Sequence, residues 1–392
     1  MKILLVWRAQ YLGETGGMER VCANLSNHFA ESGNDTAILF CAEKEGTSYF
    51  PLRENVKLIN MLEEIGNTKR MYLPWWGGIV REALRIYDKR KMYQWVSLRK
   101  NKFLSRPVKQ KIQEYNPDVI ISVDPETTIL LRESLGYNIL IPIVTMFHFP
   151  VEKSLRWQSK KEKKAIESSS VVQLLTADAA RKFSQEFPNV KTIKIPNAVL
   201  PCTQAAELQG KTKHQIVYVA RFDRHVKRQH FLVDAFAKLA NQFPNWHLVM
   251  YGYRDNEYSR YIKKMVKDRG LNYRIRLEPP TNNVYEVYKK SDIVAFPSAY
   301  EGFGLSLAEA MNAGLPSIGF ASASGVNELI KDCVTGFLAN DGVDSFADKL
   351  RLLMEDEALR VQMGKAARED MRQFEPERIW KQWDGLVSGL IH

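Results

Sequence analysis

Residues 298–316 constrain the fold more than any other stretch of this 392-residue chain. An apolar run, Ile293–Pro297, precedes them, and a second, Ser317–Phe320, follows them. Between the runs lie a glycine-containing loop and a helical pattern over Leu305–Asn312, with a glycine just past its end. This order predicts a strand, a tight loop, a short helix and a second strand, as in a sheet of parallel strands covered by helices.

The predicted loop has the features of an anion site. Gly302 and Gly304 allow the backbone to approach a ligand closely, and the following helix directs its first free N–H groups into the loop. Such a helix N-terminus favours a phosphate. Glu301 precedes the helix and Glu309 lies about one turn inside it. Because a carboxylate beside a phosphate is electrostatically unfavourable, we expect these two residues to have another task, such as binding sugar hydroxyls.

The same residues resemble a known signature. Glu301-Gly302-Phe303-Gly304, with Glu309 completing a Glu-x7-Glu spacing and 313–316 following, resembles the donor site of the group 1 retaining glycosyltransferases of sucrose, glycogen and bacterial polysaccharide synthesis. The resemblance implies an α/β fold of GT-B type, with two Rossmann-like domains facing each other across a cleft and a C-terminal helix crossing back to the first domain. The alternative is a solvated helix face after an ordinary turn.

Length and composition agree with two domains, each able to bury its own core. No apolar run approaches the ~20 residues of a membrane span, so we expect a cytoplasmic protein. The four cysteines lack Cys-x-x-Cys spacing, and the seven histidines form no pair at metal-ligand spacing. We therefore expect neither a metal site nor a cofactor, the nucleotide sugar being a substrate.

Apolar runs of strand length alternate with helix-length segments in both halves of the chain. In the first half they are Lys2–Trp7, Thr36–Cys41, Val119–Val123, Leu140–Phe147, Val171–Thr176 and Thr192–Ile195. In the second half they are Gln215–Phe222, Trp246–Gly252, Ile275–Glu278, Ile293–Pro297, Ser317–Phe320 and Gly336–Ala339. We predict an acceptor domain over 1–197, a nucleotide-sugar donor domain over 198–375, and a final helix over 376–392 that packs on the acceptor domain.

A glycine-rich loop follows the first predicted strand. It contains Gly16 and Gly17 and lacks the Gly-x-Gly-x-x-Gly spacing of dinucleotide-binding proteins. It resembles the Gly-Gly-x-Glu-Arg loop of the same glycosyltransferases, which implies an approach to the donor phosphates. A plain strand-to-helix turn is the alternative.

His148 follows the predicted strand Leu140–Phe147, at the end where open parallel sheets keep their ligands. The resemblance implies that it faces the acceptor or the donor sugar. A structural histidine is the alternative.

Basic residues follow the first strand of the second half. The resemblance places an arginine and a lysine here against the donor diphosphate, and Arg221 and Lys227 are the candidates. Lys227 comes one residue later than the family spacing, so Arg228 or Arg224 could share its task. Cations in this position can stabilise the leaving diphosphate without a metal. The alternative is a solvated basic turn.

Taken together, the resemblance implies a retaining, metal-independent enzyme. It would move a hexose or N-acetylhexosamine from a nucleotide diphosphate sugar, with UDP expected, to a lipid-linked or cell-surface glycan. Arg221 and Lys227 would hold the diphosphate with backbone N–H groups of Phe303, Gly304, Leu305 and Ser306. Glu309 would bind the ribose, and Glu301 the donor sugar. The alternatives are a phosphorylase or UDP-sugar epimerase of the same fold, and a non-catalytic binder of anionic polymer.

One stretch lies outside the resemblance. Residues 81–111 hold eleven lysine and arginine residues and two acidic ones, a net charge of +9, with aromatic residues interleaved from 71 onward. Aromatic and basic residues together suit the surface of an anionic membrane. We therefore expect peripheral attachment to the inner face of the plasma membrane, without nucleic acid as a partner. The alternatives are a solvated face and a grip on a soluble acidic acceptor.

Overall fold

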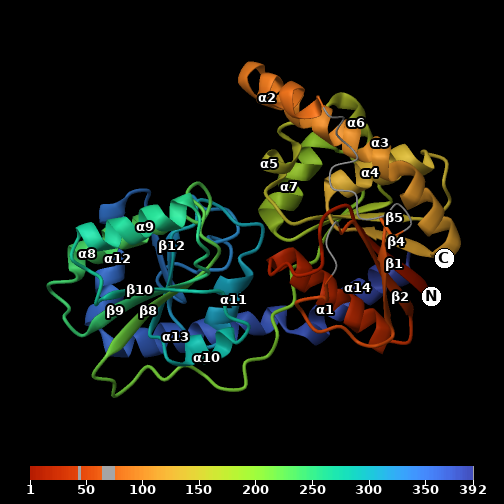
Figure 1. Cartoon of the computed structure of the whole chain (residues 1–392). Helices are drawn as coiled ribbons and strands as arrows, with labels where there is room; N and C mark the ends of the chain where they lie inside the picture. Colours follow the sequence, from red (N-terminus) through yellow and green to blue (C-terminus); the bar gives the residue numbers. More distant parts are fainter. Residues whose placement is uncertain (43–45, 64–75, 392) are drawn as a thin grey trace. The chain divides into compact units, whose positions relative to one another are not determined.

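The chain forms two compact units in the computed structural model (Figure 1), which describes residues 1–42, 46–63 and 76–391. Unit 1 contains residues 1–196 together with 380–392. Unit 2 contains residues 197–379. Each unit is built around its own parallel sheet.

The sheet of unit 1 has seven strands in the order β3-β2-β1-β4-β5-β6-β7, and all neighbouring strands are parallel. The strands are β1 (Lys2–Trp7), β2 (Asp35–Phe40), β3 (Val56–Asn60), β4 (Val119–Ser122), β5 (Ile143–Phe147), β6 (Val171–Leu174) and β7 (Thr192–Lys194). In the central strands β4 and β5 every residue is buried, because helices cover both faces of the sheet.

The helices of unit 1 are α1 (Gly17–Glu31), α2 (Gly77–Tyr87), α3 (Lys89–Tyr115), α4 (Pro125–Leu135), α5 (Val151–Leu155), α6 (Lys160–Glu167), α7 (Ala177–Glu186) and most of α14 (Pro376–Ser388). Helices α3 and α4 share one apolar core with β1 and β4, through residues such as Leu4, Leu104 and Leu130. Helix α14 attaches to α1. Trp380 stacks on His28 with the ring centroids 5.0 Å apart, and Asp384 Oδ1 lies 2.8 Å from His28 Nε2.

Unit 2 contains a six-stranded parallel sheet in the order β10-β9-β8-β11-β12-β13. Its strands are β8 (His214–Val219), β9 (Trp246–Tyr251), β10 (Ile275–Glu278), β11 (Ile293–Phe296), β12 (Ser317–Phe320) and β13 (Gly336–Ala339). Its helices are α8 (Gln229–Leu239), α9 (Glu257–Asp268), α10 (Val284–Lys289), α11 (Leu305–Asn312), α12 (Val343–Glu355) and α13 (Glu357–Met371), followed by a short 3-10 turn, Arg372–Phe374.

Both sheets reverse their strand order once. In unit 1 the reversal falls between β1 and β4, and in unit 2 between β8 and β11. At such a switch point the connections leave toward opposite sides, which opens a crevice outside the carboxyl ends of the two strands. The topology therefore marks one place for a ligand in each unit.

The two doubly wound parallel sheets confirm the predicted α/β fold class. Several predicted strand bounds differ from the structure by one to three residues, and one strand was missed. The edge strand β3 was missed, because most of its residues are polar or exposed and lack the pattern of a buried strand. Strand β5 begins at Ile143 rather than Leu140, because Pro142 has no N–H for the ladder and the Leu140 side chain is fully solvated.

Candidate functional site

The switch point of unit 2 carries an ion pair. Lys227, in the loop after β8, places Nζ 2.6 and 2.8 Å from the two carboxylate oxygens of Glu301, in the loop after β11. Only 17% of the Lys227 side chain and 11% of the Glu301 side chain are exposed. Because screening by water is weak at this exposure, the pair is a strong local dipole at the edge of the sheet.

The loop that presents Lys227 is shaped by its own side chains. The Asp223 carboxylate accepts the backbone N–H of Val226 at 2.6 Å. The buried Gln229 spans the loop, accepting the N–H of Asp223 at 3.2 Å and donating to the carbonyl of Arg221 at 2.9 Å. These bonds fix the backbone before any ligand binds, so Lys227 is preorganised.

Arg228 joins this loop to the loop of Glu301. Its guanidinium donates from Nε to the Pro297 carbonyl at 2.9 Å and from Nη2 to the Ser298 carbonyl at 3.3 Å. It lies over the rings of Phe231 and Phe320, 4.8 and 4.7 Å from their centroids. The guanidinium is thus held by two backbone carbonyls and two aromatic rings, which fixes its position between the two loops.

The structure therefore separates the candidate cations that the sequence left open. Lys227 faces Glu301, whereas Arg228 is held within the fold. Arg224 lies over the ring of Tyr261 at 5.1 Å. Arg221 is largely exposed, with its guanidinium 4.0 Å from the Asp223 carboxylate.

Tyr218 and Ser298 form a buried pair that sequence analysis missed, and Tyr218 holds the backbone of Lys227. The Tyr218 hydroxyl donates to the Lys227 carbonyl at 3.0 Å and lies 3.0 Å from Ser298 Oγ. Burial raises the pKa of Tyr218, so the hydroxyl stays protonated and can donate. In the sequence, Tyr218 is one residue of an apolar strand and has no mark of a functional role. Its contacts with Lys227 and Ser298 depend on how the two loops pack.

The backbone at Glu301 lies very close to the backbone at Ser324 and Gly325. Its N–H donates to the Ser324 carbonyl at 2.8 Å, and a Cβ added to Gly325 would lie 2.5 Å from its carbonyl oxygen. Three residues on, Gly304 caps α11 in a left-handed conformation with φ 89°, and no side chain caps this helix. The first N–H groups of α11 thus have no side-chain cap beside the ion pair, an arrangement that favours an anion.

The remaining candidates of this loop are mostly buried. Phe303 packs edge-on against Phe374 with the ring centroids 5.2 Å apart. Leu305 and Ser306 begin α11 and are half-buried. Glu309 lies on the second turn with 3% of its surface exposed, so contact with a ligand requires its carboxylate to become more accessible.

Two candidate sets lie in unit 1. Gly16 caps the N-terminus of α1 and Gly17 is its first residue, and no side chain caps this helix either. His148 follows β5 and is 8% exposed. Burial lowers the pKa of His148 to about 4, so its ring is neutral near pH 7.

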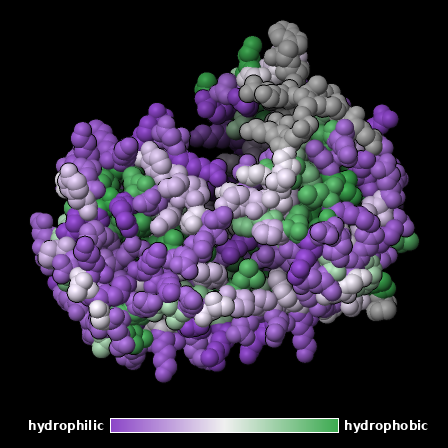
Figure 2. Space-filling model, turned by 60° about the horizontal axis from the view of Figure 1, so that its bottom comes forward, coloured by the Kyte–Doolittle hydropathy of each residue, from purple (hydrophilic) through white to green (hydrophobic). Residues whose placement is uncertain are grey.

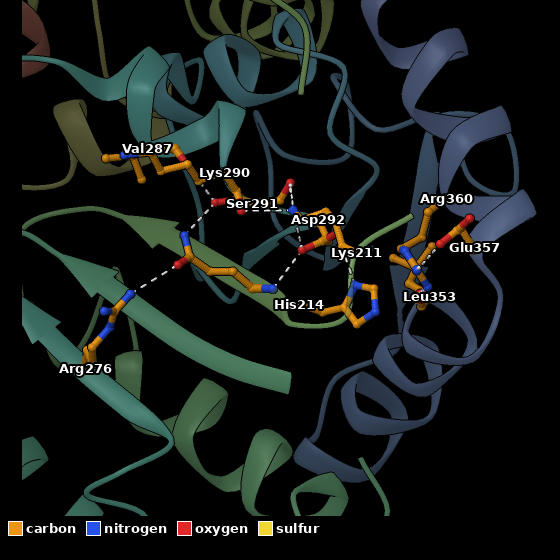
Figure 3. Close-up of polar contacts among 11 residues, drawn as sticks. Lys211, His214, Arg276, Val287, Lys290, Ser291, Asp292, Leu353, Glu357 and Arg360 are labelled. Carbon is orange, nitrogen blue, oxygen red and sulfur yellow. Dashed lines mark hydrogen bonds and ion pairs between the residues drawn. The ribbon is translucent and has the colours of Figure 1, made fainter. Parts of the chain in front are cut away.

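A different polar network lies at the amino ends of the strands of the unit 2 sheet (Figure 3). Asp292, fully buried before β11, accepts from Lys211 Nζ at 2.9 Å and from the Gln215 N–H at 2.7 Å, and its other oxygen lies 3.3 Å from His214 Nδ1. Because these partners satisfy the carboxylate at the amino ends of the strands, we assign this network to stability. Over the residues described, no three His, Cys, Asp or Glu side chains gather as a possible metal site.

The basic stretch forms α2 and α3. Some of its aromatic residues pack inward and others are exposed. Tyr93 and Phe103 turn inward, Tyr93 donating to Glu126 and Phe103 packing on the core. Tyr87 is exposed, as are Ile79 and Ile86 on α2, at 72% and 85%. Tyr72 and Trp75 lie outside the described residues. On the face shown in Figure 2, apolar side chains reach the surface in small groups among hydrophilic ones.

Comparison with known proteins agrees with this fold. A TarM variant from S. aureus, solved with fondaparinux, alpha-GlcNAc-glycerol and UDP, has the same fold, with a TM-score of 0.76 at 16% identity over 98% of this chain and 99% of that one. The fold is thus of GT-B type. Residues 203–370 match the family described as glycosyl transferases group 1, and residues 15–200 match glycosyltransferase family 4. Both models describe glycosyltransferases and together span most of the chain, so the chain belongs to the glycosyltransferases, and its second half matches group 1.

Several relatives align with this chain over nearly their full length. An uncharacterized glycosyltransferase of Haemophilus influenzae is 25% identical over 96% of this chain and 97% of its own. The amylovoran biosynthesis glycosyltransferase AmsD of Erwinia amylovora is 21% identical over 96% of this chain and 97% of its own. Within the described residues, no helix is long and apolar enough to cross a bilayer.

Proposed function

We propose that this glycosyltransferase moves a hexose or N-acetylhexosamine from a UDP-sugar to a bacterial polysaccharide or lipid-linked glycan, with retention at the anomeric carbon. The observation that carries the proposal is the Lys227–Glu301 pair, which lies beside the helix α11 N-terminus that no side chain caps, at the switch point of unit 2. UDP in the TarM complex and the polysaccharide named for AmsD support the choice of donor and product.

The geometry suggests how the reaction would proceed. Lys227 Nζ and the first N–H groups of α11 would receive the diphosphate and stabilise its charge as the sugar–oxygen bond breaks. Lys227 would then contact both Glu301 and the phosphate. Glu301 would accept hydrogen bonds from the hydroxyl groups of the donor sugar. Arg221, exposed at the start of the same loop, would add a second cation, and Glu309 would bind the ribose.

No metal is needed in this scheme, because Lys227 and Arg221 take the role of the counterion to the diphosphate. Purified protein, a panel of UDP-sugars and a lipid-linked glycan extract would be assayed for UDP release in EDTA. The proposal predicts acceptor-dependent release that EDTA leaves intact, and a product whose anomeric configuration matches the donor by NMR. Activity that EDTA abolishes and magnesium restores, or an inverted product, contradicts it.

The exposed face of α2 supports the further proposal of attachment to an anionic membrane. Ile79 and Ile86 are exposed on a helix that also carries Arg81 and Arg85, and three basic residues begin α3. Each near-surface basic residue contributes on the order of 1 kcal/mol at an anionic surface. The protein should therefore sediment with phosphatidylglycerol vesicles at low salt and leave them at high salt.

A matched pair of variants tests which surface binds. Ile86→Ser should weaken sedimentation several-fold, whereas Leu140→Ser, at an even more exposed leucine outside the basic helices, should not. Binding that is unchanged in Ile86→Ser, or wild-type protein that ignores the vesicles at low salt, contradicts attachment through α2.

A further inference from the structure

The chain passes between the two units twice, and the segments beside both passages meet at one phenylalanine. The first passage follows Pro196 and the second follows Ile379. Phe374 ends the 3-10 turn between α13 and α14, shortly before the second passage. Its carbonyl accepts the N–H of Val199, shortly after the first passage, at 2.9 Å. The two segments are therefore joined at Phe374 within unit 2.

The side chain of Phe374 contacts the loop between β11 and α11, which contains Glu301. Its ring packs edge-on against the ring of Phe303, which is 4% exposed. Phe303 lies between Glu301 and Gly304, the left-handed residue after which α11 begins. Because buried side chains are closely packed, a displacement of Phe374 shifts the backbone that carries the Glu301 carboxylate and the first N–H groups of α11.

The position of Phe374 follows from the residues that come after it. Pro376 begins α14, and proline suits the first position of a helix because its nitrogen has no hydrogen to leave unpaired. The residue before a proline avoids the helical conformation, and Glu375 accordingly has φ −56° and ψ 141°. The chain therefore bends between α13 and α14. The bend holds the ring of Phe374 on Phe303 and its carbonyl on Val199.

The other end of α11 is bonded to the same segment that follows the first passage. Asn312, the last residue of α11, donates from Nδ2 to the Leu200 carbonyl at 2.9 Å. The Ala313 carbonyl accepts the Ala206 N–H at 2.7 Å. This segment thus contacts the C-terminal end of α11 directly and the N-terminal end through Phe374. Helix α11 is held at both ends by the part of the chain that connects the two units.

We propose that Phe374 is a positioning residue for Glu301 and the N-terminus of α11, and that the two passages between the units act on these groups through it. The inference rests on the proposed function in one respect: the ligand that these groups receive is the diphosphate of the donor. Coupling of this kind is reciprocal. A ligand that fixes the loop of Glu301 must therefore also stabilise the hydrogen bond between Val199 and Phe374.

Hydrogen exchange of the full chain, measured by mass spectrometry with and without saturating UDP, tests this coupling. The proposal predicts that UDP slows exchange of the Val199 N–H about threefold or more, because its bond to Phe374 opens less often. Peptides over the turn before β9, residues 241–245, should exchange at the same rate in both conditions. This comparison uses the wild-type protein, so it does not depend on how a variant folds.

A set of variants tests the contact between the two rings. Phe374→Leu should weaken UDP binding about tenfold in isothermal titration, because small displacements of binding groups are costly. It should also abolish the effect of saturating UDP on exchange at Val199. Phe374→Tyr keeps the ring and should bind UDP as the wild type does. Phe243→Leu, the same change at a half-buried phenylalanine in the turn before β9, should leave UDP binding unchanged.

A double-mutant cycle shows whether Phe374 acts through Phe303. In a Phe303→Leu background, Phe374→Leu should weaken UDP binding by less than about twofold, because both changes remove one contact. Equal losses in the two backgrounds contradict the inference.

Two further results overturn the inference alone. One is that UDP binds the wild type without slowing exchange at Val199, and the other is that UDP binds Phe374→Leu as tightly as the wild type. Failure of UDP to bind the wild type contradicts the proposed function, and the inference with it.

Discussion

The two switch points share a topology and differ in their electrostatics. In unit 2 a lysine faces a glutamate across two loops, beside a helix N-terminus that no side chain caps. In unit 1 the Arg8 guanidinium donates to Asn101 on α3, and Glu126 accepts from the neutral side chains of Tyr93 and Gln158. The two sheets thus offer the same kind of crevice, and we expect the cation in unit 2 to favour an anionic ligand there.

The largest expected effect comes from removing the charge of the Glu301 carboxylate in unit 2. Glu301→Gln should leave the protein folded and lower turnover by about two orders of magnitude, the scale for losing one preorganised electrostatic contact. The measurement is steady-state UDP release with saturating donor.

Asp292→Asn is the matched control at the other edge of the same sheet. It should cost about 3 kcal/mol of stability, since it breaks a buried charged network, while turnover below its melting temperature stays near wild type. If Glu301→Gln retains turnover while Asp292→Asn loses it, the catalytic site lies at the amino ends of the strands, near Asp292, and the account is wrong.

A second prediction concerns Arg228 as the residue that positions Lys227. Arg228→Met keeps the apolar stem and removes the bonds to Pro297 and Ser298. Turnover should fall about tenfold, because small displacements of a reacting group are costly. In a Glu301→Gln background the same change should matter much less, since both act through one pair. Equal losses in the two backgrounds would mean that Arg228 contributes only to stability.

Tyr93, which donates to Glu126 in unit 1, gives a smaller effect. Tyr93→Phe removes the hydroxyl that holds Glu126 Oε1 and keeps the ring packed on Trp157. The KM for the acceptor should rise roughly three- to tenfold, the scale of one hydrogen bond to a charged or partly charged group, with the KM for the donor unchanged. A rise in the donor KM instead would remove the distinction between the two switch points.

The smallest effect is a pH dependence. Burial lowers the pKa of His148 from 6.5 to about 4, so between these values the unfolded chain binds a proton that the folded chain does not. Stability therefore falls as the pH drops from about 6.5 to about 4. His148→Phe should flatten this part of the profile of unfolding free energy against pH. An unchanged slope would show that other groups, such as His230 and His247, whose pKa values burial also lowers, carry it.

Much of this account was predictable from sequence, for a physical reason. Buried parallel strands are continuous apolar runs, and glycines that need a positive φ, such as Gly304, mark the loops between them. The fold class and the loop of Glu301 follow from these local patterns. The rule that pointed to His148, a polar residue just after a buried strand, would also have pointed to Arg8 and Asp124.

What sequence could not supply are contacts between distant segments. Whether Lys227 or Arg228 faces Glu301 depends on the left-handed backbone at Arg228, which no local pattern indicates. The bond between Gln158 and Glu126 joins a helix start to a loop 32 residues away, so it requires the folded chain. Which aromatic residues of the basic stretch lie at the surface also depends on tertiary packing, which turns Tyr93 and Phe103 inward.

The central claim is that the Lys227–Glu301 switch point binds the diphosphate of the donor. Isothermal titration of the full chain with UDP and with uridine tests it most directly. We predict that UDP binds at least tenfold more tightly than uridine, and that Lys227→Ala removes most of this difference, because a charge-assisted hydrogen bond contributes about 1.5–3 kcal/mol. Equal affinity for UDP and uridine, or a UDP affinity that Lys227→Ala leaves unchanged, would contradict the claim.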